Sequence, residues 1–242
     1  MEIQIAVSKI NRYSTPDSGD TLEVVERPSG GLSVVLADGQ SIGQESKVIS
    51  ALVVHKVVSF LAEGIRDSAA ARAVSDFLYT EHNGKVSATL NILSVDLQTN
   101  TVVISRNNNA PVFVVARNRI DCLSSESMPI GSARNIRPSI CELPLESGMT
   151  IVMYTDGLLH AGECYGKSPD ICTTLEAMVL DMDTSPQDIP SPQKLADALL
   201  ANAIRLDEGR PEDDISVVVL KSMGQSRDSI RRMDIRFPVN LI

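Results

Sequence analysis

Four aspartates in this chain lie beside predicted strands, where they could bind a metal ion together. Asp38 and Asp156 each follow an apolar run and precede a glycine, whereas Asp213 comes just before the apolar run 215–220. Asp20 lies upstream, in a Ser-Gly-Asp sequence. Carboxylates gathered at one place repel one another, and hard cations such as Mg²⁺ or Mn²⁺ prefer oxygen ligands. The pattern therefore fits a divalent metal site, with no Lys or Arg inside the cluster.

Each aspartate also has a simpler explanation. Asp-Gly is a common turn dipeptide, and an aspartate at a strand end is usually an exposed turn residue. If strand 215–220 runs antiparallel to the two strands that end in Asp-Gly, all three ends meet at one edge of a sheet. Gly39 and Gly157 would then let the backbone turn sharply, and the bare carbonyl of a glycine can approach an ion closely. Spacing alone leaves both interpretations open.

The composition indicates a globular protein with an aliphatic core. The chain has 242 residues, of which 43% are hydrophobic and only 3% aromatic, with no tryptophan. The net charge of -9 argues against a nucleic-acid or anionic membrane partner. The exception is an arginine cluster near the end of the chain, which we interpret as a solvated face. Its members are Arg227, Arg231, Arg232 and Arg236.

The cysteines and the chain start favour a cytoplasmic protein. Cys122, Cys141, Cys164 and Cys172 lack the close spacing of a zinc site and are too few for a disulfide framework, so reduced thiols are expected. Residues 1–10 do not have the pattern of a signal peptide. No apolar stretch approaches the ~20 residues that span a bilayer.

Strands and helices are predicted in separate groups. The expected strands are 3–7, 22–26, 32–37, 86–95, 101–106, 111–116, 120–123, 137–143, 150–154 and 215–220, and the expected helices are 44–61, 68–82, 170–182 and 191–207. This order favours an α+β fold with sheets between helices. The simplest organisation is a single domain over 1–242, with a core of about 1–221 and an extension, 222–242, that contains a candidate strand at 233–239.

Six short segments, in their order and spacing, resemble the metal-dependent protein phosphatases of the PPM family (type 2C), and most of all their bacterial SpoIIE-like branch. The segments are Ser18-Gly19-Asp20, Ala37-Asp38-Gly39, Ser87-Ala88-Thr89-Leu90, Pro129-Ile130-Gly131, Tyr154-Thr155-Asp156-Gly157 and Asp213-Asp214-Ile215-Ser216. The resemblance covers residues 15 to 221. A short chain with no added sensor domain is most similar to the stressosome phosphatases of that branch.

The resemblance implies two stacked antiparallel sheets with a pair of antiparallel helices on each side, and two Mn²⁺ or Mg²⁺ ions in an acidic cleft. Asp38 would bridge both ions. Asp20 and the carbonyl of Gly39 would bind one, and Asp156 and Asp213 the other. The implied reaction is hydrolysis of phosphoserine or phosphothreonine by a metal-activated water, with Asp38, Asp156 and Asp213 as the catalytic ligands.

The resemblance also implies the partners. A stressosome phosphatase would act, as a monomer, on phosphorylated stressosome scaffold proteins. The alternatives are a SpoIIE-like phosphatase of a phosphorylated anti-anti-sigma factor, and a non-catalytic binding module of the same fold. The chain departs from eukaryotic members at Pro16, where they carry an arginine that holds the substrate phosphate; Arg12 is nearby but does not match that position.

Overall fold

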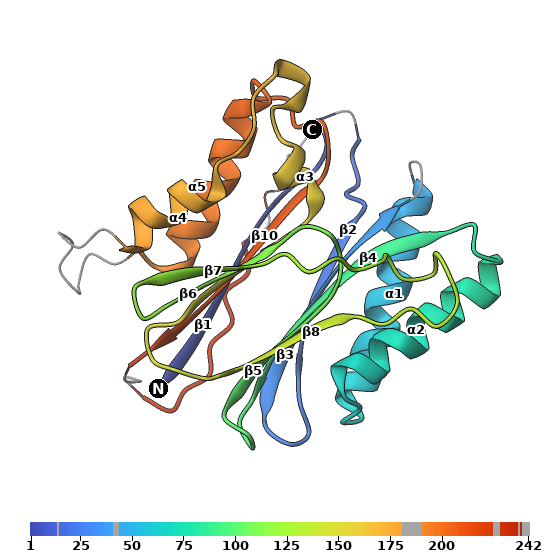
Figure 1. Ribbon diagram of the computed structural model, residues 1–242, viewed down its shortest axis with the longest axis horizontal. Coiled ribbons are helices and arrows are strands. Elements are labelled where there is room, and N and C mark those ends of the chain that lie inside the picture. Colours follow the sequence, from blue (N-terminus) through green and yellow to red (C-terminus); the bar gives the residue numbers. More distant parts are fainter. Residues whose placement is uncertain (14, 41–43, 181–189, 225–227, 237, 239–242) are drawn as a thin grey trace.

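The computed structural model describes residues 1–13, 15–40, 44–180, 190–224, 228–236 and 238. Within them, ten strands form two five-stranded antiparallel sheets that stack on each other (Figure 1). The first sheet has the order β1 (Glu2–Ile10), β10 (Ile215–Met223), β9 (Thr150–Tyr154), β6 (Val112–Ala116) and β7 (Arg119–Leu123). The second has the order β2 (Asp20–Glu26), β3 (Gly31–Gln40), β4 (Ser87–Asp96), β5 (Thr101–Asn107) and β8 (Ser139–Pro144). The predicted α+β fold is confirmed.

Helices cover the outer face of each sheet (Figure 1). The second sheet carries α1 (Gln44–Ala62) and α2 (Asp67–His82). The first sheet carries α3 (Asp156–His160), α4 (Ile171–Leu175), a π-helical segment (Glu176–Leu180) and α5 (Pro192–Leu206), and a 3₁₀ turn (Glu163–Tyr165) follows α3. Among the described residues, no helix is long and apolar enough to cross a membrane.

The inner strands β3, β4, β9 and β10 contain long apolar runs because both of their faces are buried. In β3, Val34 and Leu36 face the other sheet, whereas Val35 and Ala37 pack against α1 and α2. The cluster between the sheets is aliphatic, as the composition predicts, and includes Leu93, Ile104, Ile151, Met153, Val218 and Leu220. These layers hold the strand ends, and thus the acidic residues, at fixed positions.

Local signals set the helix ends where they were predicted. Asn83 adopts a left-handed conformation after α2, with a φ of 53°, and its N–H bonds to the carbonyl of Tyr79. Ser191 caps α5, since its side chain accepts a hydrogen bond from the N–H of Lys194 at 3.3 Å, and Pro192 occupies the first turn.

Three predictions about elements need correction. The helix expected at 170–182 is α-helical only to Leu175 and continues as a π-helical segment; its predicted end, 181–182, lies outside the described residues. The short helix α3 was not predicted. The prediction of a strand at 233–239 is wrong for the described residues 233–236 and 238, none of which is in a strand.

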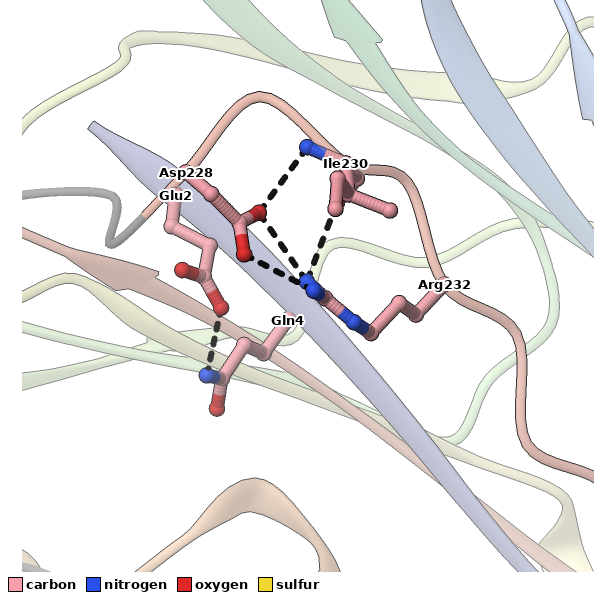
Figure 2. A network of polar contacts seen from close by, with 5 residues as sticks. All are labelled: Glu2, Gln4, Asp228, Ile230 and Arg232. Carbon is pink, nitrogen blue, oxygen red and sulfur yellow. Dashed lines mark hydrogen bonds and ion pairs between the residues drawn. The ribbon is translucent and has the colours of Figure 1, made fainter.

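The described part of the C-terminal extension makes polar contacts close to strand β1 (Figure 2). Asp228 accepts hydrogen bonds from the N–H of Ile230 at 2.9 Å and from the Arg232 guanidinium at 2.7 and 3.0 Å. Arg231 pairs with Glu26 of β2 at 2.8 Å. Both arginine side chains are mostly exposed, as expected for a solvated face.

Removing side-chain volume between the sheets should destabilise the fold. Leu36 is fully buried there, so Leu36→Ala should lower the free energy of unfolding by about 2–5 kcal/mol. Val24, on the adjacent strand β2, is 40% exposed. Val24→Ala should therefore cost about 1 kcal/mol or less in the same urea titration. Equal losses for the two variants would contradict the assignment of the core.

Candidate metal centre

The predicted acidic residues come from both sheets. Asp20 begins β2 and lies opposite Asp38 of β3 in the antiparallel ladder. Asp156 begins α3 directly after β9, and Asp213 lies just before β10, which pairs antiparallel with β9. The prediction that three strand ends share one edge of one sheet is therefore wrong. The antiparallel orientation of β9 and β10 is confirmed, but β3 belongs to the second sheet.

Asp38 lies inside its strand and not at the strand end. Strand β3 continues to Gln40, and Asp38 pairs with Thr89 of β4. Burial raises the pKa of Asp38 to about 8, and the negative charges of four other aspartates add to this effect. These are Asp20, Asp156, Asp213 and Asp214. The structure thus brings the predicted carboxylates within electrostatic reach of Asp38.

Asp20 is completely buried, and its two carboxylate oxygens have different surroundings. Oδ2 accepts hydrogen bonds from the hydroxyl of Thr155 at 3.0 Å and the hydroxyl of Ser216 at 2.5 Å. Oδ1 is buried and has no partner among the described residues. Burial raises the pKa of Asp20 to about 7, against the opposing effect of the Ser216 hydrogen bond. A buried carboxylate oxygen without a protein donor can accept a bond from water or bind a cation.

The glycines after Asp38 and Asp156 serve close packing and not sharp turns. Neither has a left-handed φ among the described residues. A Cβ on Gly39 would overlap the carbonyl oxygen of Ser46, and one on Gly157 would overlap the carbonyl oxygen of Asp214. The carbonyl of Gly39 accepts a hydrogen bond from the Ser46 hydroxyl. The reason given for these glycines on sequence grounds is therefore corrected.

The acidic pair before β10 is divided between two roles. The carboxylate of Asp214 accepts hydrogen bonds from the N–H of Arg12 at 2.9 Å and the N–H of Gly19 at 2.7 Å. It therefore holds both ends of the loop that leads to Asp20. Asp213 is exposed and accepts only the N–H of Asp214, at 2.8 Å, in the described contacts. Partial desolvation raises the pKa of Asp213, and the charges of Asp156 and Asp214 add to it.

Two lysines were missed by the sequence reasoning, which expected no cation among the carboxylates. Lys9 of β1 and Lys47 of α1 both donate to the backbone carbonyl of Asp20, at 2.6 and 3.0 Å. Burial lowers the pKa of Lys9, although the charge of Asp20 opposes the shift. The two residues are far apart in sequence, and only the packing of α1 and β1 around Asp20 brings them together.

The donors fit a hard divalent cation by their chemistry. The acidic cluster offers oxygen atoms only, and one buried carboxylate oxygen of Asp20 has no partner among the described residues. Burial, together with the neighbouring negative charges, raises the pKa of Asp38. In the described parts of the chain, no three His, Cys, Asp or Glu side chains lie close enough to hold an ion as they stand. The carboxylates of the acidic cluster would therefore have to move closer to one another when a cation binds.

The fold of this chain is that of a PP2C-type phosphatase domain. The structure resembles the PP2C phosphatase domain, with a fragment of the regulatory domain, of SpoIIE from Bacillus subtilis, with a TM-score of 0.77 and 19% identity over 93% of this chain and 64% of that chain. It also resembles RsbX in complex with magnesium (TM-score 0.66, 15% identity, 90% of this chain and 94% of that chain). A third neighbour is the catalytic domain of the serine/threonine phosphatase PstP in complex with two manganese ions. Its TM-score is 0.67 and its identity 15%, over 92% of this chain and 99% of that chain.

The chain belongs to the SpoIIE family, because the model of stage II sporulation protein E matches residues 28–222. Stage II sporulation protein E of Priestia megaterium is 22% identical over 204 residues, which are 84% of this chain and 34% of that protein. The chain thus spans about a third of this relative. The expected membership of the SpoIIE-like branch is confirmed. The narrower expectation, a particular similarity to the stressosome phosphatase RsbX, is not specifically favoured, because RsbX is one structural neighbour among several.

The metal-free protein should lose stability as the pH rises. Asp20 and Asp38 ionise near pH 7 and 8 when folded, against 3.8 as the ordinary value, so the folded chain binds more protons over this range. Their contribution to stability is complete below about pH 4 and is lost as the pH rises through 7 and 8. In EDTA at about pH 8.5, Asp38→Asn should be more stable to urea than the unaltered protein, by about 1 kcal/mol or more.

The control is Asp17→Asn, at an exposed aspartate of the neighbouring loop. It should leave the pH dependence unchanged. If Asp38→Asn gives the same stability as the unaltered protein at every pH, ionisation of Asp38 does not destabilise the fold and the account is wrong on this point.

Proposed function

We propose that this chain is a Mn²⁺- or Mg²⁺-dependent phosphatase that removes phosphate from phosphoserine or phosphothreonine in a protein. The observation that carries the proposal is the unpartnered Oδ1 of buried Asp20, within electrostatic reach of Asp38, in a member of the SpoIIE family. Mg²⁺ and Mn²⁺ accompany two structural neighbours, which supports the choice of ion.

The ligands that we propose are those expected from the sequence. Asp38 would be shared by two ions, Asp20 and the carbonyl of Gly39 would serve one, and Asp156 and Asp213 the other. We prefer Asp213 to Asp214 because both oxygens of Asp214 already accept backbone N–H groups. When bound, such ions supply an activated water and offset the charge of the phosphoryl group.

The chain itself contributes position and charge. The β2–β3 ladder holds Asp20 opposite Asp38, and the loop that Asp214 anchors leads directly into Asp20. Arg12, at the other end of that loop, brings positive charge to the acidic cluster, since its charge partly opposes the rise that desolvation causes in the pKa of Asp213. This charge would favour an anionic phosphoprotein segment, although Arg12 does not occupy the position of the missing family arginine.

For the substrate, we propose a phosphorylated anti-anti-sigma factor. The support is the match to stage II sporulation protein E, both as a family and in the curated relatives. A stressosome scaffold protein has no comparable support. We further propose one catalytic domain over about 1–221, with 222–242 as an extension, that acts in the cytoplasm as a monomer.

Activity on a phosphoserine anti-anti-sigma protein should need both Mn²⁺ and Asp38. EDTA should abolish phosphate release, and Asp38→Asn should reduce it at least about 100-fold. Asp156→Asn should cost less, since Asp156 would serve one ion and Asp38 two. Asp17→Asn is the matched acidic control, because Asp17 is an exposed aspartate that is not a proposed ligand, and its replacement should leave activity unchanged.

Two outcomes would contradict the proposal. Phosphate release that survives EDTA, or that is indifferent to Asp38→Asn, would reject the metal-dependent mechanism. Complete inactivity with Mn²⁺, on both the anti-anti-sigma and the stressosome phosphoproteins, would favour a non-catalytic binding module.

A further inference from the structure

The hydrogen bonds around Asp20 leave one of its carboxylate oxygens fully bonded and the other bare. Oδ2 receives two hydroxyl donors, Thr155 Oγ1 and Ser216 Oγ, whereas Oδ1 has no partner among the described residues. All three side chains are essentially inaccessible to solvent, with 0–1% exposure, so water does not compete for these bonds. The direction of the carboxylate is therefore set by the two hydroxyls.

The proton positions in this network follow from the donors. The backbone N–H of Ser216 donates to Thr155 Oγ1 at 2.9 Å, and an N–H group can only donate. Thr155 Oγ1 accepts that bond and keeps its single proton for Asp20 Oδ2. Ser216 Oγ, at 2.5 Å from the same oxygen, donates its own proton. Two charge-assisted hydrogen bonds thus stabilise the carboxylate through Oδ2 alone.

The same residues join the two sheets at the acidic cluster. Thr155 directly follows β9, and Ser216 lies near the start of β10. The N–H of Thr155 donates to the carbonyl of Ser216 at 3.1 Å. Asp20 belongs to β2 of the other sheet. Thr155 immediately precedes Asp156, and Ser216 follows Asp213 by three positions. Holding Asp20 in this way also fixes its place relative to two other proposed ligands.

We propose that Thr155 and Ser216 are positioning residues that occupy Oδ2 of Asp20 and direct the bare Oδ1 to a divalent cation. The inference rests on the proposed metal-dependent function. Residues that orient a metal ligand typically change metal affinity by about 10–100-fold when they are replaced. A purely structural hydroxyl would change stability and leave metal affinity as it is.

The test is the affinity of the full chain for Mn²⁺, measured by isothermal titration calorimetry. Ser216→Ala removes one hydroxyl and leaves both backbone N–H bonds in place, so it is the cleaner variant. It should weaken Mn²⁺ binding by about 10-fold or more. Thr155→Val should have a similar effect, and Thr155→Ser, which keeps the hydroxyl, should restore most of the affinity.

Two buried hydroxyls without partners provide matched controls. Ser105 and Thr150 are each 1% exposed, and neither hydroxyl has a hydrogen-bond partner among the described residues. Thr150 lies on β9, the strand that precedes Thr155. Ser105→Ala and Thr150→Val should leave Mn²⁺ affinity unchanged. Circular dichroism establishes that each variant is folded, and if Thr155→Val does not fold, Ser216→Ala decides the question.

The outcomes separate this inference from the function on which it rests. Weaker Mn²⁺ binding by folded Ser216→Ala, with unchanged binding by Ser105→Ala, would support the positioning role. Unchanged affinity in folded Ser216→Ala and in every folded Thr155 variant would overturn the positioning role and leave the metal-dependent function standing. Failure of the unaltered chain to bind Mn²⁺ would overturn both.

Discussion

The burial of the Asp20 carboxylate is the constraint on which the rest of the site depends. A buried charge needs hydrogen bonds or an opposite charge, and Asp20 receives hydroxyl donors at one oxygen only. Distant parts of the chain contribute to its surroundings. The residue after β9 and strand β10 supply those hydroxyls, β1 and α1 supply lysines to its carbonyl, and β3 places Asp38 opposite. The stacking of the two sheets is what makes this convergence possible.

The cluster is a source of instability in the absence of a cation. Burial, and to a lesser extent like charges, raise the pKa of both Asp20 and Asp38, so ionising these carboxylates at neutral pH lowers the folding free energy that the rest of the chain provides. The large aliphatic clusters on both sides of each sheet can offset that cost. A cation that binds there would remove the repulsion, and binding and stability are thereby linked.

The sequence was sufficient to predict most elements, and it failed where distant segments meet. The apolar run of β3 and the caps at Asn83 and Ser191 are local signals, so they could be read directly. That Asp38 and the strand before Asp156 belong to different sheets is a property of the topology, and no local pattern encodes it. For the same reason, Gly39 was attributed to a turn, when the actual cause is the approach of Ser46. The hydroxyls of Thr155 and Ser216 gained a role only when Asp20 was placed beside them.

The central claim is that the bare Oδ1 of Asp20 faces the position of a divalent cation. The most direct measurement is a crystal structure of the protein grown with Mn²⁺, with the ion located by its anomalous scattering. The account predicts Mn²⁺ in direct contact with Oδ1, while Oδ2 keeps its bonds to Thr155 and Ser216. Mn²⁺ bound at Oδ2 with those hydroxyls displaced, or fully occupied elsewhere with Asp20 untouched, would contradict it.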